Sequence, residues 1–184
     1  MAMGLLAHHL AARGMDARVH SAGTIGWGGP ATDHAVEVLA ARGIDLSEHL
    51  SRRLAGDHVA EADLVLGMTR DHVNGVLIHD PQAAARTFVM GEVVRLGQRV
   101  GPRRPDQSLR EWAAAVAALR TPNRPPGIGR DEIEDPVGLG LEVYRATAER
   151  LDALCRELAA LVLPDGAHGE IVDIDPIDDT SPLP

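Results

Sequence analysis

Asp135 and Pro136 are the residue pair in this sequence whose types most directly suggest chemistry. Proline restricts the backbone of the residue before it and so limits where that carboxylate can point. A carboxyl group held in this way can serve as a general acid or base. The alternative is structural, because Glu132, Glu134 and Asp135 precede an expected helix and acids are favourable near a helix N-terminus. Spacing alone favours the structural alternative.

Cys155 is the single cysteine and a candidate nucleophile. It falls on one face of an expected helix over residues 141–162, and the apolar residues of that face are Tyr144, Ala148, Leu151, Leu158 and Val162. Cysteines on such a face are usually buried and inert. We therefore predict that Cys155 is a core residue. A single cysteine also excludes an internal disulfide framework and a cysteine-based metal cluster.

Ser21, Trp27 and His49 are polar or aromatic residues of expected loops in residues 17–54. This stretch predicts a strand over Ala17–His20, a glycine-rich turn, a helix opening near Thr32, and then a second loop. That order gathers loop side chains at the carboxyl ends of parallel strands. Taken singly, Ser21 is a turn former, His49 an exposed loop residue and Trp27 an apolar plug at the sheet edge.

The remaining pattern predicts an α/β fold with a small parallel sheet. Further strands are expected over Ala62–Met68 and Thr87–Met90. Helices are expected over residues 1–13, 69–78, 91–99 and 141–162. Ser108 and Glu111 predict a capping box that opens another helix, inside a Pro/Gly/Arg-rich insertion at about residues 100–130.

Composition narrows the function classes. The chain has 184 residues with a net charge of −9, and all 18 of its basic residues are arginine. This balance disfavours general nucleic-acid binding, and no apolar run has the length that spans a bilayer. The histidines are too scattered to predict a metal site, so no metal or cofactor is expected. We expect a cytoplasmic domain over residues 1–162 and an acidic, disordered tail over 163–184.

Three segments together resemble a known family. They are Ser-Ala-Gly-Thr at 21–24, Gly-Ile-Asp-Leu-Ser-Glu-His-Leu-Ser-Arg at 43–52, and Asp135-Pro136. With Met-Ala-Met-Gly-Leu-Leu at 1–6, they resemble the low-molecular-weight protein tyrosine phosphatases over roughly residues 1–162. The resemblance implies a three-layer α/β/α fold with a four-stranded parallel sheet in the order 2-1-3-4.

The resemblance also implies roles for particular residues. Asp135 would be the general acid that protonates the leaving oxygen and then activates water against a phosphocysteine. Ser21 and His49 would hold the phosphate loop in shape, and Trp27 would form a wall of the substrate cleft. The substrate would be a phosphorylated protein or a small aryl phosphate. The tyrosine that follows Asp-Pro in the family is replaced here by Val137.

The family's catalytic Cys-x5-Arg-Ser-Pro loop, which would precede residues 1–6, does not occur in the 184 residues. Cys155 cannot replace it, because position 161 is Leu161. We therefore expect an N-terminal truncation that removes the first strand and the loop, and no activity from the chain as given. The alternative is a binding or regulatory protein on a catalytically dead phosphatase fold. Arsenate reductase is rejected for want of redox cysteines, whereas a phosphoarginine phosphatase stays open.

Overall fold

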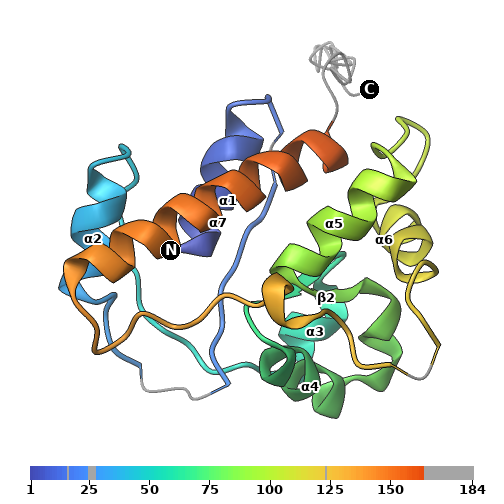
Figure 1. Ribbon diagram of the computed structural model, residues 1–184, viewed down its shortest axis with the longest axis horizontal. Coiled ribbons are helices and arrows are strands. Elements are labelled where there is room, and N and C mark those ends of the chain that lie inside the picture. Colours follow the sequence, from blue (N-terminus) through green and yellow to red (C-terminus); the bar gives the residue numbers. More distant parts are fainter. Residues whose placement is uncertain (16, 25–27, 123, 164–184) are drawn as a thin grey trace, which may run out of the picture.

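A parallel pair of strands, β1 (Val65–Gly67) and β2 (Thr87–Val89), forms the sheet of the protein. The structure is a computed structural model that describes residues 1–15, 17–24, 28–122 and 124–163. Around the strands lie the helices α1 (Ala2–Ala11), α2 (Asp33–Ala40), α3 (Gly56–Glu61), α4 (Arg70–His79), α5 (Met90–Val100), α6 (Leu109–Ala117) and α7 (Leu141–Val162) (Figure 1). Short 3-10 turns, η1 (Pro81–Arg86) and η2 (Gly129–Asp131), complete the described elements.

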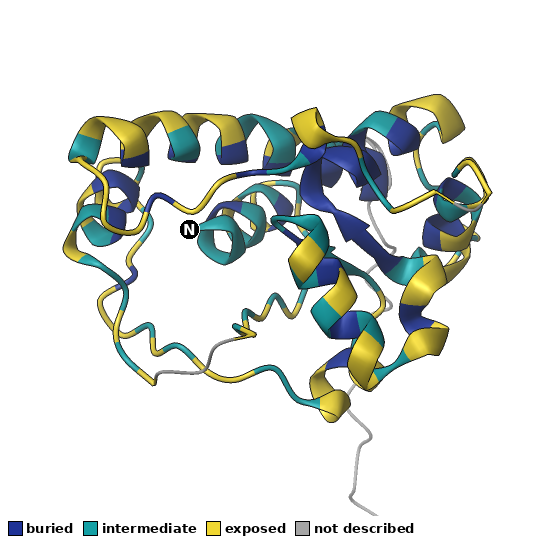
Figure 2. Cartoon of the chain, turned by 60° about the horizontal axis from the view of Figure 1, so that its bottom comes forward, coloured by how far each residue is buried: buried dark blue, intermediate teal, exposed yellow. Residues whose placement is uncertain are grey.

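The two strands are consecutive along the chain and are joined by a helical crossover. Val65 pairs with Thr87 and Gly67 with Val89, and α4 with η1 connects them. Parallel neighbours need such a crossover because a hairpin cannot join them. Thr69 begins α4 by accepting a hydrogen bond from the His72 N–H. All three residues of β2 are buried, and the chain passes directly into α5 (Figure 2). The strands predicted within Ala62–Met68 and Thr87–Met90, and the α/β class, are thus confirmed.

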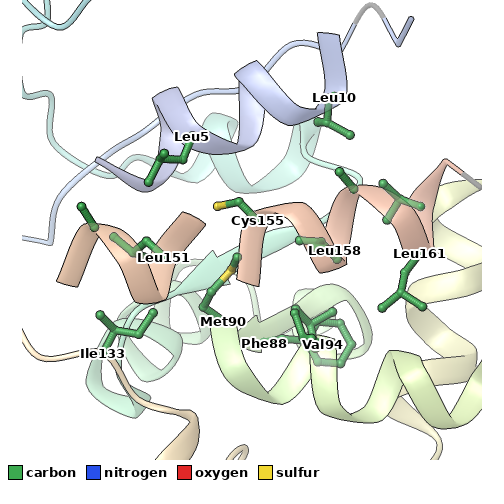
Figure 3. Packing of buried hydrophobic residues seen from close by; sticks show 14 of the residues in the cluster. Leu5, Leu10, Phe88, Met90, Val94, Ile133, Leu151, Cys155, Leu158 and Leu161 are labelled. Carbon is green, nitrogen blue, oxygen red and sulfur yellow. The ribbon is translucent and has the colours of Figure 1, made fainter. Parts of the chain in front are cut away.

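The core lies where α7 packs on α1 and α5. The predicted apolar face of α7 is buried as a whole, and its members are Tyr144, Ala148, Leu151, Cys155, Leu158 and Val162. Leu5 and Leu10 of α1 cover it from one side, while Phe88, Met90 and Val94 meet it from the other (Figure 3). Burial of side chains of this size stabilises by about 1.5–3 kcal/mol each. The bounds of α7 agree with the predicted helix.

The predicted strand at Ala17–His20 is wrong. These residues are irregular in the structure, and the first inter-strand contact of this segment is the isolated parallel bridge between Gly23 and Arg53. A strand exists only where its backbone N–H and C=O groups pair with a neighbour. Alternation of side chains indicates which face is buried, but it does not supply that neighbour.

The segment around α6 packs on α5 as a covering layer. Ser108 and Glu111 form the predicted capping box, with the Ser108 N–H donating to Glu111 Oε2 at 2.8 Å. Trp112 is fully buried and its Nε1 donates to the Gly101 carbonyl at 3.0 Å. Whether residues 100–130 are an insertion stays a prediction. The acidic tail predicted from residue 163 falls, from residue 164 on, outside the described residues.

Of the helices that the structure describes, none combines the length and the apolar character required to cross a membrane.

Candidate active site

The segment that carries Asp135 continues the edge of the sheet beyond β1. The Ile133 N–H donates to the Met68 carbonyl at 2.8 Å, one residue after β1 ends. Ile133 and Pro136 are buried, whereas Asp135 between them is exposed. The backbone is therefore anchored on both sides of Asp135 at the carboxyl end of β1.

Glu132 anchors this segment to α4. Its Oε1 accepts the Arg70 N–H and its Oε2 accepts Arg70 Nη2, each at 2.9 Å. The Arg70 side-chain and backbone hydrogen bonds lower the pKa of the Glu132 carboxyl group. The sequence suggested that the acids preceding Pro136 favour the N-terminus of the helix at 141–162. For Glu132 this was wrong, because it caps α4 instead.

Asp131 anchors the segment to α5. Its carboxylate receives two hydrogen bonds from Arg95, at 3.1 Å and 2.7 Å, and a third from the Ile128 N–H at 2.8 Å. Burial opposes ionisation, yet the hydrogen bonds from Arg95 and Ile128 outweigh it, so the pKa of Asp131 is lowered. The carboxylate is 3% exposed, which makes this pair a structural anchor rather than a surface contact.

Asp135 presents one carboxylate oxygen in a fixed orientation. Its Oδ1 accepts the Val137 N–H at 3.0 Å, as in an Asx turn. Its Oδ2 makes no hydrogen bond to any other described residue. Asp135 also lies close enough to Met1 that its charge acts on the Met1 amino group, whose pKa is lowered mainly by burial. The exposed carboxylate is therefore within electrostatic range of the Met1 amino group, which directly precedes α1.

His49 lies near the same end of α1, in an open pocket of about 630 Å³. Met3 of α1 lines the pocket together with residues 45–46 and 48–52. Burial, and then the positive charges of Met1 and Arg52, lower the pKa of the His49 imidazole. Helix N-termini attract anions, so the pocket combines residues near a helix end with a histidine whose pKa is lowered. Among the described residues, no group of three or more His, Cys, Asp and Glu side chains could hold a metal ion.

Backbone hydrogen bonds hold the loop that carries His49. The Gly23 N–H donates to the Arg52 carbonyl at 2.8 Å, and the Gly23 carbonyl accepts the Leu54 N–H at 2.9 Å. The Ser51 N–H donates to the Gly29 carbonyl at 2.9 Å. Ser21, two residues before Gly23, is half-buried and makes no hydrogen bond to another described residue. Its predicted role stays a prediction, and Trp27 lies outside the described residues.

Cys155 is buried, as predicted. It is 0% exposed on α7, facing α1, and its Sγ lies 3.7 Å from the Ala2 carbonyl (Figure 3). Burial, with a smaller contribution from the Asp152 charge, raises the pKa of the Cys155 thiol to about 12. A nucleophilic cysteine needs the opposite shift, because the thiolate is the reactive form.

We expect Cys155→Ala to lower the free energy of unfolding by about 1 kcal/mol, as small truncations in the core do. The raised pKa also predicts that stability is complete below the unfolded-state value near 9 and falls as the pH rises toward about 12. Urea unfolding of both proteins at about pH 8 and pH 10 measures this. An equal loss of stability with pH in Cys155→Ala would show that another group titrates. Cys155→Ser is the matched variant, because its hydroxyl replaces the thiol as a donor to the Ala2 carbonyl and does not titrate in this range.

The sequence did not predict that Arg70 and Arg95 anchor the segment before Asp135. The acidic run at 131–135 signalled that carboxylates would be used, but their partners lie 62 and 36 positions away. Arginine is common throughout this chain, so no local feature distinguishes these two arginines from the others.

Gly91 of α5 allows the segment that leads from Asp131 to Asp135 to pack closely against this helix. A Cβ at this position would lie 2.6 Å from Asp131 Cα and 2.7 Å from the Asp131 carbonyl oxygen. Both atoms belong to the backbone, so they cannot move without displacing the segment that leads to Asp135. We expect Gly91→Ala to lower the free energy of unfolding by about 2–3 kcal/mol.

Gly56→Ala is the matched control for this prediction, measured by urea unfolding. A Cβ at Gly56, also in a helix, meets nothing within 4 Å, and alanine favours helices by up to about 1 kcal/mol over glycine. An equal response of the two variants would show that the short approach at Asp131 relaxes without cost.

A protein-family comparison and searches for relatives agree on one group of enzymes. The model described as low molecular weight phosphotyrosine protein phosphatase matches residues 1–99. A probable low molecular weight protein-tyrosine-phosphatase, EpsP of Ralstonia nicotianae, is 39% identical over 66 residues, which are 36% of this chain and 46% of that relative. The chain thus spans about half the length of this relative. A protein-arginine-phosphatase of Bacillus subtilis is 27% identical over 83% of this chain and 80% of its own.

Solved structures show the same similarity. The low molecular weight protein tyrosine phosphatase of T. tengcongensis superposes with a TM-score of 0.62 at 31% identity. The superposition covers 85% of this chain and 86% of that one.

Proposed function

The chain belongs to the low molecular weight phosphotyrosine protein phosphatase family, and we propose that it serves to hydrolyse a phosphorylated side chain of a protein through a phosphocysteine. The observation that carries this proposal is the position of Asp135. Its carboxylate is exposed and oriented by Val137, and its charge acts on the Met1 amino group that directly precedes α1. Helix N-termini stabilise phosphoryl groups, so an acid there can reach a leaving atom.

The proposed reaction has two steps. A thiolate attacks phosphorus, so that the P–S bond forms and the bond to the leaving atom breaks, while Asp135 gives that atom a proton. Water then attacks the phosphocysteine, Asp135 takes the proton of the water, and inorganic phosphate and the thiolate are released. His49 and Ser21 would support the loop that carries the thiolate.

The nucleophile is proposed to come from a segment other than the 184 residues of this chain. Cys155 is the one cysteine of the sequence, and it is buried with a raised pKa. A Cys-x5-Arg loop placed before Met1 would stand at the N-terminus of α1, where backbone N–H groups and the helix dipole favour a thiolate and an anion.

Phosphotyrosine is the first candidate substrate, and phosphoarginine is the second. The similarity to the Bacillus subtilis protein-arginine-phosphatase extends over 83% of this chain, which favours keeping it as a candidate. Val137 and Gly138 follow Asp135-Pro136, so no aromatic side chain at these positions can stack on a phosphotyrosine ring. We further propose a cytoplasmic enzyme with no cofactor and no nucleic-acid partner, consistent with a net charge of −9.

The test compares the 184-residue chain with a form that carries a strand and a Cys-x5-Arg-Ser-Pro loop before Met1. We expect no hydrolysis of para-nitrophenyl phosphate by the first and turnover by the second. Phosphotyrosine and phosphoarginine peptides then decide the substrate through kcat/KM. A loop-bearing form that folds but does not turn over any of these would favour the alternative, a phosphatase-fold binding protein.

A further inference from the structure

A second pocket, separate from the pocket beside His49, opens between α5, η2 and α7. Its volume is about 280 Å³, and it shares no lining residue with the first pocket. Val94, Ala153 and Leu154 provide its apolar lining. Arg95, Arg130 and Arg150 line it as well, together with one acid, Asp131. Ligand pockets usually combine such an apolar surface with a few charged groups.

Two of the three arginines are not neutralised. Arg95 is paired with Asp131 by two hydrogen bonds, so these two charges offset each other. Arg150 donates through Nη2 to the Arg130 backbone carbonyl at 2.5 Å, which is not an acid. The Arg130 guanidinium makes no hydrogen bond or ion pair with another described residue. The Arg130 charge also acts on Asp131, but three arginines and a single acid line the pocket. The lining therefore carries an excess of two positive charges on a chain whose net charge is −9.

The nearby carboxylates are already engaged. Glu92 of α5, which also acts on Arg95, is bound by Arg120 at 2.9 Å. Glu157 of α7 accepts a hydrogen bond from Gln98 at 2.6 Å. Neither forms an ion pair with Arg130 or Arg150. Asp131, whose charge acts on Arg130, accepts its hydrogen bonds from Arg95 and Ile128, so a ligand does not have to break a hydrogen bond between an acid and these arginines.

We propose that this pocket binds a small phosphate monoester, with its phosphoryl group between Arg130 and Arg150 and its organic part against Val94, Ala153 and Leu154. Guanidinium groups bind phosphoryl oxygens through short, charge-assisted hydrogen bonds. A volume of about 280 Å³ suits a ligand the size of a phosphorylated ring or short chain. The site is independent of the proposed catalysis, because it needs neither a nucleophile nor Asp135.

Binding at this pocket would stabilise the acid-bearing segment. Arg130 belongs to η2, directly before Asp131 and the run that leads to Asp135, whereas Arg150 belongs to α7. A phosphoryl group held by both arginines would connect the two elements. A ligand that binds only the folded protein raises its unfolding temperature.

The test titrates the 184-residue chain with phenylphosphonate, a stable analogue of a phosphate monoester, at about pH 7.5. We expect saturable binding by calorimetry, a raised unfolding temperature, and shifted methyl NMR signals of Val94 and Leu154. Arg130→Gln and Arg150→Gln should each weaken binding about tenfold, as the loss of a charged hydrogen bond does. Arg99→Gln is the matched control. Arg99 is an exposed arginine of α5 outside the pocket lining, and its loss should change the affinity less than about twofold.

Benzoate lacks the phosphoryl group and inorganic phosphate lacks the organic part, so these two ligands separate the contributions of the two parts to binding. Weaker binding of both than of phenylphosphonate supports a site for phosphate monoesters. Equal binding of benzoate would overturn the ligand class. Shifts confined to His49, an equal loss in Arg99→Gln, or no saturation at about 10 mM ligand would each overturn the site, because an affinity weaker than this is non-specific.

Discussion

Asp135→Asn, in the form that carries the Cys-x5-Arg loop, lowers kcat on phosphotyrosine peptides by about 10²–10⁴-fold, the usual contribution of a general acid. Asparagine keeps the size of the side chain and an oxygen that can accept the Val137 N–H, now at 3.0 Å. It removes the proton that the leaving oxygen needs. The turn should therefore persist while proton donation is lost.

The identity of the leaving group gives this prediction a second readout. A leaving phenol of low pKa departs without protonation, so the loss with para-nitrophenyl phosphate should be smaller than with a phenyl phosphate. Glu134→Gln is the control, because Glu134 is the exposed acid next to Asp135 and makes no hydrogen bond to another described residue. A loss below threefold with phenyl phosphate in Asp135→Asn, or the same loss in Glu134→Gln, would contradict the assignment.

Local patterns predicted those elements that a few neighbouring residues determine. The bounds of α7 follow from its repeating apolar face, and the start of α6 follows from Ser108 and Glu111. The strand predicted at Ala17–His20 failed because pairing depends on a partner elsewhere in the chain. Local sequence indicates burial and capping, but it does not indicate which segments meet.

The same distinction applies to the candidate site. Asp135 and His49 were singled out through the resemblance, and their catalytic roles stay predictions. The charge of Asp135 acts on the Met1 amino group, and His49 lines a pocket together with Met3 of α1. The two arginines that anchor the segment before Asp135 could not be found in this way. The apolar patterns of α4 and α5 predict these helices without reference to Arg70 or Arg95. Only the three-dimensional structure shows that Glu132 binds Arg70 and that Asp131 binds Arg95.

Glu92→Leu is expected to lower the free energy of unfolding by about 3 kcal/mol, the largest effect on stability among these predictions. Glu92 is 2% exposed and accepts two hydrogen bonds from Arg120, at 3.0 Å and 2.9 Å. Its Oε2 also accepts the Val89 N–H at 3.3 Å. The substitution leaves the Arg120 guanidinium in a largely buried place without its counter-ion.

Arg120 keeps its other contacts in the Glu92→Leu variant. The expected loss of unfolding free energy is therefore at the lower end of the usual 3–5 kcal/mol for breaking a buried ion pair. Its guanidinium still donates to the Ala84 and Thr87 carbonyls, at 2.8 Å and 2.7 Å. Its Cζ also lies 4.3 Å from the centre of the Phe88 ring, a contact worth about 0.5–2 kcal/mol.

The double variant Glu92→Leu/Arg120→Leu separates the cost of an unpaired charge from the cost of lost packing. Replacing both partners with apolar side chains removes the charge that Glu92→Leu alone leaves unneutralised. The double variant should therefore lose about 1–3 kcal/mol less than the sum of the two single variants in urea unfolding. Additive losses would mean that the two side chains act separately, and that Arg120 is held by the Ala84 and Thr87 carbonyls rather than by Glu92.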